Sequence, residues 1–363
     1  MKTLQEYKHV TVILVSLFCT LFSGCASMGP GTIGRDRINY DQAITQSWQR
    51  QLLLNLVKIR YGDTPVFLDV SSITNSYGVE TQVNLTASWW WNLDRAGDQA
   101  LGGLTRYTDK PTITYSPLLG QRFTRSLMTP ISPGVVLSLM QSGWAADAVL
   151  RMMVSSINGV QNRFAAGARA RGADPEFYRL GTALRRIQAS GAMGMRIEKL
   201  KEQEWSMMTL ARDKTSESAA QDQQIVREIL NLKPGVDEYR VVFGSARRNE
   251  DEIAMITRTI LEMLFDLSAT IEVPQADVQD GRTLATRVFE SDGPGGFRPM
   301  LRIVSGLERP QDEFVAVQYR DHWFWVQDRD YPSKLLLSFV LILLSLTDVD
   351  PGKGSPIITI PAN

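Results

Sequence analysis

The sequence predicts an α+β fold: an N-terminal helix, a β-ribbon and short helices, followed by a C-terminal domain that mixes helices and sheet. Two periodicities support this prediction. Apolar residues recur at helical spacing over residues 41–60, and polar and apolar residues alternate over residues 79–87. Beyond residue 176 segments of both kinds follow one another, so the chain is predicted to be neither all helix nor all strand.

Residues 41–60 are predicted to form an amphipathic packing helix. Trp48, Leu52 and Leu56 share its apolar stripe. Asp41 can cap the first turn, and Gly62 ends the pattern. This helix opens a first module that we expect to cover residues 41–161.

A long hairpin is expected next, with a glycine-rich connector at residues 95–103. Trp89, Trp90 and Trp91 stand near its turn. Successive residues of a strand point to opposite faces, so Trp90 is expected to face away from the other two. The three tryptophans are either a contact surface or a plug at the end of the core. The expected strands span residues 66–70, 79–87 and 112–115.

Residues 162–175 are rich in alanine, glycine and arginine and are predicted to link the first module to a domain at 176–363. Residues 335–346 are apolar on all sides but too short to cross a bilayer, so they are expected to be buried beneath a sheet. The expected helices span 135–140, 146–157, 177–190, 217–232, 250–267 and 333–346. The expected strands span 239–243, 301–304, 314–319, 323–326 and 357–360.

The N-terminus has the pattern of a signal peptide, with lysines before an apolar run at residues 10–22. The residues that follow, Phe22-Ser23-Gly24-Cys25, resemble the lipobox of bacterial lipoproteins. That resemblance implies cleavage between Gly24 and Cys25 and acylation of the Cys25 thiol. Residues 25–40 would then be the acylated cysteine and a flexible tether.

Ala26 follows the cysteine where an aspartate would direct retention at the inner membrane. The resemblance therefore implies an outer-membrane lipoprotein that faces the periplasm, anchored durably by its acyl chains. An ordinary secretory signal with an incidental cysteine, or an uncleaved anchor, is the alternative.

Several further stretches resemble a family of envelope lipoproteins from Gram-negative proteobacteria. They are FTRSLMTPISP, QSGW, SINGVQNR and HWFWVQDRDYPSK, and the resemblance covers most of the chain after the signal. It implies a location in the envelope and brings no activity and no catalytic residue.

Composition excludes several kinds of chemistry. After cleavage, 37 basic and 38 acidic side chains remain, which gives no reason to expect a nucleic-acid partner. Cys19 leaves with the signal and His322 is the one remaining histidine, so Cys/His zinc sites and Cys–His dyads are excluded. A Ser-His-Asp arrangement would need His322, whose simpler role is that of a polar residue in a turn. Ser333 and Lys334 are better explained as a helix start than as a catalytic pair. We predict no catalytic residue, metal site or cofactor.

Six arginines between residues 163 and 186 face only two acidic residues in the same stretch. They could form a basic face for lipid phosphates, but a solvated helix face beside a loop is the simpler interpretation.

Three functions remain open. The sequence predicts a lipid-anchored envelope protein with a non-catalytic structural or interaction role. Its expected partners are the membrane, through the lipid, and another envelope protein or a glycan. The alternatives are lipid or lipopolysaccharide handling in an apolar cavity, and carboxylate-based hydrolysis of envelope polymers.

Replacement of Cys25 by serine is expected to abolish acylation, because the lipid is attached to the thiol. Metabolic labelling with a clickable fatty acid measures this directly. Label retained at the parental level in Cys25→Ser would show that Cys25 is not the acylated residue.

Overall fold

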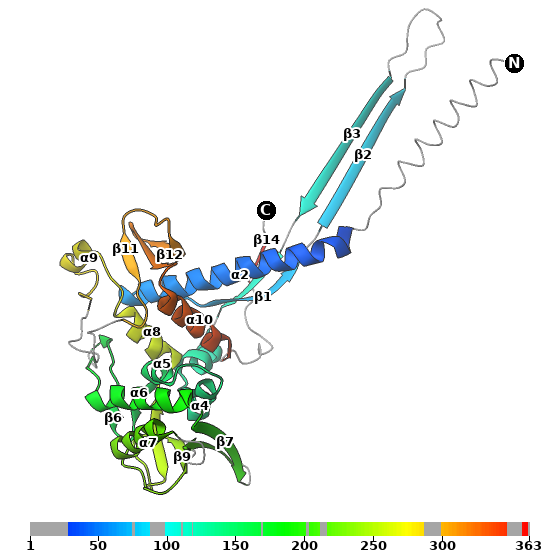
Figure 1. Cartoon of the computed structure of the whole chain (residues 1–363). Coiled ribbons are helices and arrows are strands. Elements are labelled where there is room, and N and C mark those ends of the chain that lie inside the picture. Colours follow the sequence, from blue (N-terminus) through cyan, green and yellow to red (C-terminus); the bar gives the residue numbers. More distant parts are fainter. Residues whose placement is uncertain are drawn as a thin grey trace, which may run out of the picture. The chain divides into compact units, whose positions relative to one another are not determined.

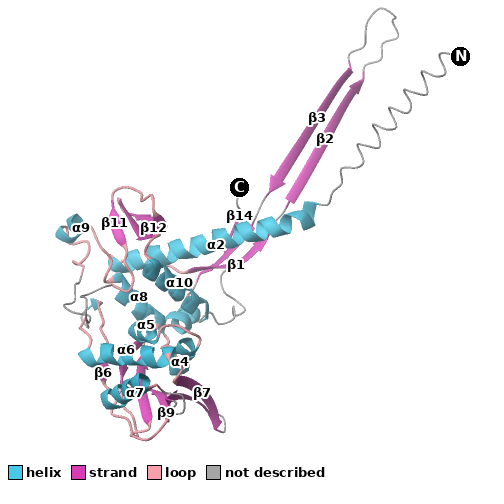
Figure 2. Ribbon diagram, in the orientation of Figure 1, coloured by secondary structure: helices cyan, strands magenta, loops and turns pink. Residues whose placement is uncertain are grey.

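The structure is a computed structural model, and it describes residues 28–74, 77–87, 99–109, 112–117, 119–167, 170–200, 203–210, 216–286, 299–346 and 358–361. The chain divides into two units, Met1–Trp48 and Gln49–Asn363. The described part of the first unit is helical and belongs to α2. Helices and mixed sheets together make an α+β fold, as the sequence predicts (Figure 2).

The described helices and strands alternate along most of the second unit (Figure 1). The helices are α2 (Met28–Arg60), α3 (Gly120–Phe123), the π-helical turn η1 (Thr124–Met128), α4 (Pro133–Gln141), α5 (Ala146–Met153), α6 (Pro175–Ala189), α7 (Glu217–Ile229), α8 (Ile260–Ser268), α9 (Gln275–Gln279) and α10 (Tyr331–Leu346). The strands are β1 (Leu68–Thr74), β2 (Tyr77–Ala87), β3 (Gln99–Asp109), β4 (Thr112–Pro117), β5 (Val154–Ile157), β6 (Val160–Gln161), β7 (Met193–Leu200), β8 (Gln203–Leu210), β9 (Glu238–Phe243), β10 (Glu252–Thr257), β11 (Val304–Gly306), β12 (Glu313–Tyr319), β13 (His322–Gln327) and β14 (Ile358–Pro361).

The largest sheet has six strands in the order β6-β5-β10-β9-β8-β7. Only β9 and β10 run parallel in it, and the other neighbours are antiparallel. Helix α6 packs between α5 and α7 beside this sheet (Figure 1). Strands β5 and β6 precede residues 162–175 in the sequence, and strands β7, β8, β9 and β10 follow them. Residues 162–175 therefore connect two parts of the same sheet.

Two smaller sheets and a ribbon complete the described strands. One sheet has the order β11-β13-β12, and its two-residue turn places Arg320 at a φ of 53° between β12 and β13. Another has the order β1-β4-β14. Strands β2 and β3 form a ribbon of their own in unbroken antiparallel register.

A hairpin is present, but the expected pairing of residues 79–87 with residues 112–115 is wrong. Residues 79–87 pair with β3, whereas residues 112–117 of β4 pair with β1. The expected connector at 95–103 is wrong from Gln99 onward, because β3 begins there. Glycine has a low strand propensity on its own, but the long register across from β2 overrides it.

Three predictions about helical segments need correction. The expected helix at 146–157 ends at Met153, because strand β5 begins at Val154. Helix α2 begins at Met28, so the expected tether at 25–40 is helical from that residue. Pro30 does not prevent this, because a proline in the first turn gives up no helical hydrogen bond. The expected helix at 250–267 is strand β10 followed by α8, which starts with a capping box between Thr259 and Glu262.

Helix α10 is buried on one side only, although its sequence is apolar on all sides. Leu337, Val340 and Leu343 belong to the core, whereas Leu335 and Ile342 are 42% and 45% exposed. The expectation of a fully buried helix is therefore wrong, and the exposed side of α10 is apolar.

Replacement of Leu337 by alanine is expected to lower the free energy of unfolding by roughly 2–5 kcal/mol, because it leaves a cavity in the core. Ile342→Ala on the exposed side of α10 is the control and should change it by less than about 1 kcal/mol. Denaturant unfolding followed by circular dichroism measures both, and equal effects would contradict the assigned faces of α10.

Candidate functional site

A pocket of about 970 Å³ opens between helices α5 and α10. The loop after α4, the segment before β11 and the loop after β13 complete its walls. Its lining residues are Ser142, Gly143, Trp144, Ala145, Asp147, Ala148, Val149, Arg151, Pro299, Met300, Arg302, Gln327, Arg329, Asp330, Pro332, Ser333, Leu335, Leu336 and Phe339.

Much of the pocket wall is apolar. The rings of Trp144 and Phe339 contact each other with their centroids 4.4 Å apart and their planes at 50°. Leu335, Leu336 and Met300 extend the same surface. Leu335 belongs to the exposed apolar side of α10, so the pocket accounts for part of that exposure.

Arg151 supplies a positive charge in the pocket that no described carboxylate neutralises. Its guanidinium lies 5.8 Å from the centroid of the Tyr178 ring, and among the described residues no carboxylate pairs with it. The other charged groups of the pocket, Asp330 apart, are in ion pairs. These pairs are Arg302–Glu272 at 3.0 Å, Arg329–Asp312 at 3.1 Å and Asp147–Arg185 at 3.0 Å.

One amide from α6 fixes the loop that carries Trp144. The Gln188 side-chain nitrogen donates to the carbonyls of Met140 and Trp144 at 2.5 and 2.7 Å, and its oxygen accepts from the Ala146 N–H at 3.0 Å. Gly143 turns the chain just before the tryptophan with a φ of 103°, a conformation that favours glycine. The Trp144 position therefore depends on backbone contacts.

The start of α10 is fixed in a similar way. Asp330 accepts from the Ser333 N–H at 3.2 Å and from its hydroxyl at 2.8 Å, as a helix cap does. The same hydroxyl accepts from the Arg302 N–H at 2.9 Å. Ser333 and Lys334 thus belong to a helix start, and Lys334 pairs with Asp328.

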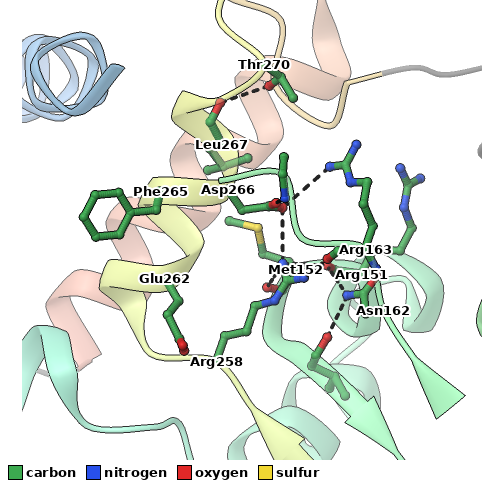
Figure 3. A network of polar contacts seen from close by, with 12 residues as sticks. Arg151, Met152, Asn162, Arg163, Arg258, Glu262, Phe265, Asp266, Leu267 and Thr270 are labelled. Atoms are coloured by element: carbon green, nitrogen blue, oxygen red, sulfur yellow. Dashed lines mark hydrogen bonds and ion pairs between the residues drawn. The ribbon is translucent and has the colours of Figure 1, made fainter. Parts of the chain in front are cut away.

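A buried ion-pair network adjoins the C-terminal end of α5, and Figure 3 shows its residues. Asp266 of α8 is 3.2 Å from the Arg258 guanidinium and 3.6 Å from that of Arg163. Its other oxygen accepts from the Ala165 N–H at 2.6 Å. The side chains of Arg258 and Asp266 are only 1% and 3% exposed, so this pair is removed from water.

The network holds the C-terminal end of α5. Arg258 donates to the carbonyls of Arg151 and Met152 at 3.4 and 3.5 Å. Asn162 donates to the carbonyls of Arg151 and Val154 at 2.9 and 2.6 Å (Figure 3). Two buried side chains therefore fix the backbone at the residue that carries the pocket cation.

Burial lowers the pKa of the Arg258 guanidinium, because desolvation penalises its charged form. Asp266 opposes this effect and favours the charge, and Glu262 adds a smaller contribution in the same direction. Glu262 also closes the capping box of α8. The network thus depends on carboxylates close to the buried cation.

His322, the one histidine that follows the predicted signal, lies near a buried carboxylate. Burial raises the pKa of Asp277, but hydrogen bonds from Tyr61 and Arg282, together with the charges of Arg282 and His322, outweigh this and lower it. The Tyr61 hydroxyl donates to Asp277 at 2.6 Å, and burial and this contact raise the pKa of Tyr61. Among the described residues no serine hydroxyl bonds to His322.

Most of the site residues that the sequence predicts are not among the residues that the structure describes. Gly24, Cys25, Trp89, Trp90 and Trp91 lie outside the described residues. The arginine-rich stretch is mostly paired: Arg163 is buried against Asp266, and three others have carboxylate partners. Those three pairs are Arg171–Asp174, Arg185–Asp147 and Arg186–Asp222.

Sequence reasoning missed the pocket. Trp144 ends the QSGW stretch and Arg151 falls within the expected helix at 146–157, but nothing in their spacing connects them with α10. No described group of three or more His, Cys, Asp or Glu side chains is placed to hold a metal ion.

Comparisons of this chain with protein-family models, curated proteins and solved structures find no match. Within the described residues, no helix has both the length and the apolar character needed to cross a membrane.

Asp266→Asn is expected to lower the free energy of unfolding by roughly 3–5 kcal/mol, because two buried guanidinium groups lose their common carboxylate. Asp312→Asn, which breaks an exposed pair with Arg329, is the control and should cost less than about 1 kcal/mol. If the two variants unfold at the same denaturant concentration, the buried network does not hold the fold.

Proposed function

We propose that this chain is a lipid-anchored protein on the periplasmic side of the outer membrane that binds an anionic amphiphile without chemical conversion. The pocket between α5 and α10 carries this proposal, because it combines an apolar wall with one guanidinium that no described carboxylate neutralises. The anchor rests on the resemblance of residues 22–25 to a lipobox.

The pocket suits an acyl chain in size and chemistry. Its volume lies within the range of ligand sites of about 300–1,000 Å³. Each buried methylene contributes about 0.8 kcal/mol, so roughly ten of them supply about 8 kcal/mol before the cost of association. Arg151 can donate paired hydrogen bonds to a carboxylate or phosphate headgroup. Fatty acids and phospholipids share this chemistry.

The other functions that the sequence leaves open have less support. The two carboxylates of the pocket are engaged, Asp147 with Arg185 and Asp330 with Ser333. This does not favour hydrolysis by a free carboxylate pair. A contact role for Trp89, Trp90 and Trp91 towards a protein or glycan remains a prediction from the sequence.

Arg151→Met is expected to weaken the binding of laurate about tenfold, because it removes a charge-assisted hydrogen bond and keeps the apolar stem. Displacement of a dansyl-labelled fatty acid from a chain that starts at residue 28 measures this. Decanol, which carries no charge, should bind Arg151→Met and the parental chain alike. Arg309→Met, an exposed arginine outside the pocket, is the matched control.

A second variant tests the pocket itself. Ala148→Phe adds a ring to the α5 wall and is expected to block laurate and decanol together. Unchanged laurate binding in both Arg151→Met and Ala148→Phe would overturn the proposed site.

A further inference from the structure

Two opposite charges lie one turn apart on the pocket helix α5 and do not pair with each other. Asp147 stands in the first turn of α5 and Arg151 in the last, and both line the pocket. Residues four apart are neighbours on a helix surface, and an acidic residue before a basic one is the favourable order for an ion pair. Among the described residues, however, Asp147 pairs with Arg185 and not with Arg151.

Helix α6 supplies a separate partner for each of these charges. Arg185 donates to Asp147 at 3.0 Å, whereas the Arg151 guanidinium lies over the Tyr178 ring, 5.8 Å from its centroid. Tyr178 and Arg185 are two helical turns apart, so they share one face of α6. The two contacts therefore draw the acidic and the basic group of α5 toward different positions along α6.

Close packing of the two helices determines which residue reaches Asp147. Helices α5 and α6 lie side by side (Figure 1). Gly181 lies between Tyr178 and Arg185 on the same face of α6 and is buried. A Cβ atom at Gly181 would lie 3.5 Å from both the Cα and the Cβ of Asp147. The α6 backbone thus passes directly beside Asp147, and Arg185, one turn further along, reaches its carboxylate.

The pair between Arg185 and Asp147 matters more for the charge of the pocket than for the fold. Its side chains are 55% and 37% exposed, and exposed ion pairs add little to stability. Without Arg185, Asp147 would be an unpaired anion one turn from Arg151. It would then compete with a ligand headgroup for the Arg151 guanidinium.

We propose that Arg185 is a positioning residue that holds Asp147 away from Arg151 and so keeps the Arg151 guanidinium available to an anionic headgroup. Arg185 is not among the residues that line the pocket, and it acts on the ligand through Asp147. Tyr178 supports the same arrangement, because an aromatic face attracts a cation. The effect on headgroup binding rests on the proposed function, whereas the separation of the two charges does not.

Chemical labelling measures how accessible the Arg151 guanidinium is. Full-length protein in a nonionic detergent is treated with phenylglyoxal, which reacts with guanidinium groups, and modification of Arg151 is followed by mass spectrometry. Arg185→Met is expected to slow this modification about threefold, because Asp147 then pairs with Arg151. The double variant Arg185→Met with Asp147→Asn should restore the parental rate. Arg185→Lys should keep that rate, because an ammonium group can still hold Asp147.

Arg179→Met is the matched control, because it removes an exposed positive charge from α6 and leaves the contact with Asp147 in place. It should label at the parental rate. An unchanged rate in Arg185→Met would overturn the positioning role. Slow labelling that persists in the double variant would overturn it as well, because Arg185 would then act through the fold and not through Asp147.

Protection by laurate separates this role from the proposed function. Laurate should protect Arg151 of the parental protein from phenylglyoxal, and Arg185→Met should need about threefold more laurate for equal protection. The double variant should need no more than the parental protein. Equal protection of the parental protein and Arg185→Met would contradict the effect of Arg185 on the headgroup. If laurate protects none of the proteins while the labelling rates change as expected, the lipid site fails and the positioning role stands.

Discussion

The ion pair between Arg258 and Asp266 is the contact on which the described part of this protein depends most. It joins the loop after β10 to helix α8, and Arg258 also donates to carbonyls at the end of α5. A buried charge is tolerated only where a partner and hydrogen bonds compensate for lost water. The chain therefore has to bring α5 against the segment from Arg258 to Asp266, about a hundred residues away in sequence, before the site can exist.

The pocket follows from that arrangement. One wall is α5, held by the network, and the opposite wall is α10, whose start is fixed by Asp330 and Ser333. Gln188 sets the loop between α4 and α5, so the Trp144 ring meets Phe339. Backbone contacts fix these walls, and the pocket between them therefore remains open. Under the proposed function, Arg151 adds the one charge that selects an anionic headgroup.

Local signals predict much of the fold, but not the site. Residues 314–319 and 323–326 are rich in aromatic and β-branched residues on either side of a tight turn, and the structure has β12 and β13 there. The apolar run of β10 is buried almost throughout, so it lacks the alternation that separates strand from helix, and its pattern predicts a helix. Arg163 stands in an arginine-rich stretch that suggests a solvated face, yet it is buried against Asp266. This partner lies about a hundred residues away in sequence. Such long-range pairs leave no local pattern.

The most direct test of the pocket is to identify the lipids that the protein binds in the cell envelope. Full-length protein is purified in mild detergent, its lipids are extracted, and they are quantified by mass spectrometry beside those of Ala148→Phe. We expect about one anionic acyl lipid per parental chain and its loss from the variant. Equal lipid in both proteins, or none in either, would contradict the claim that the pocket between α5 and α10 is a lipid site.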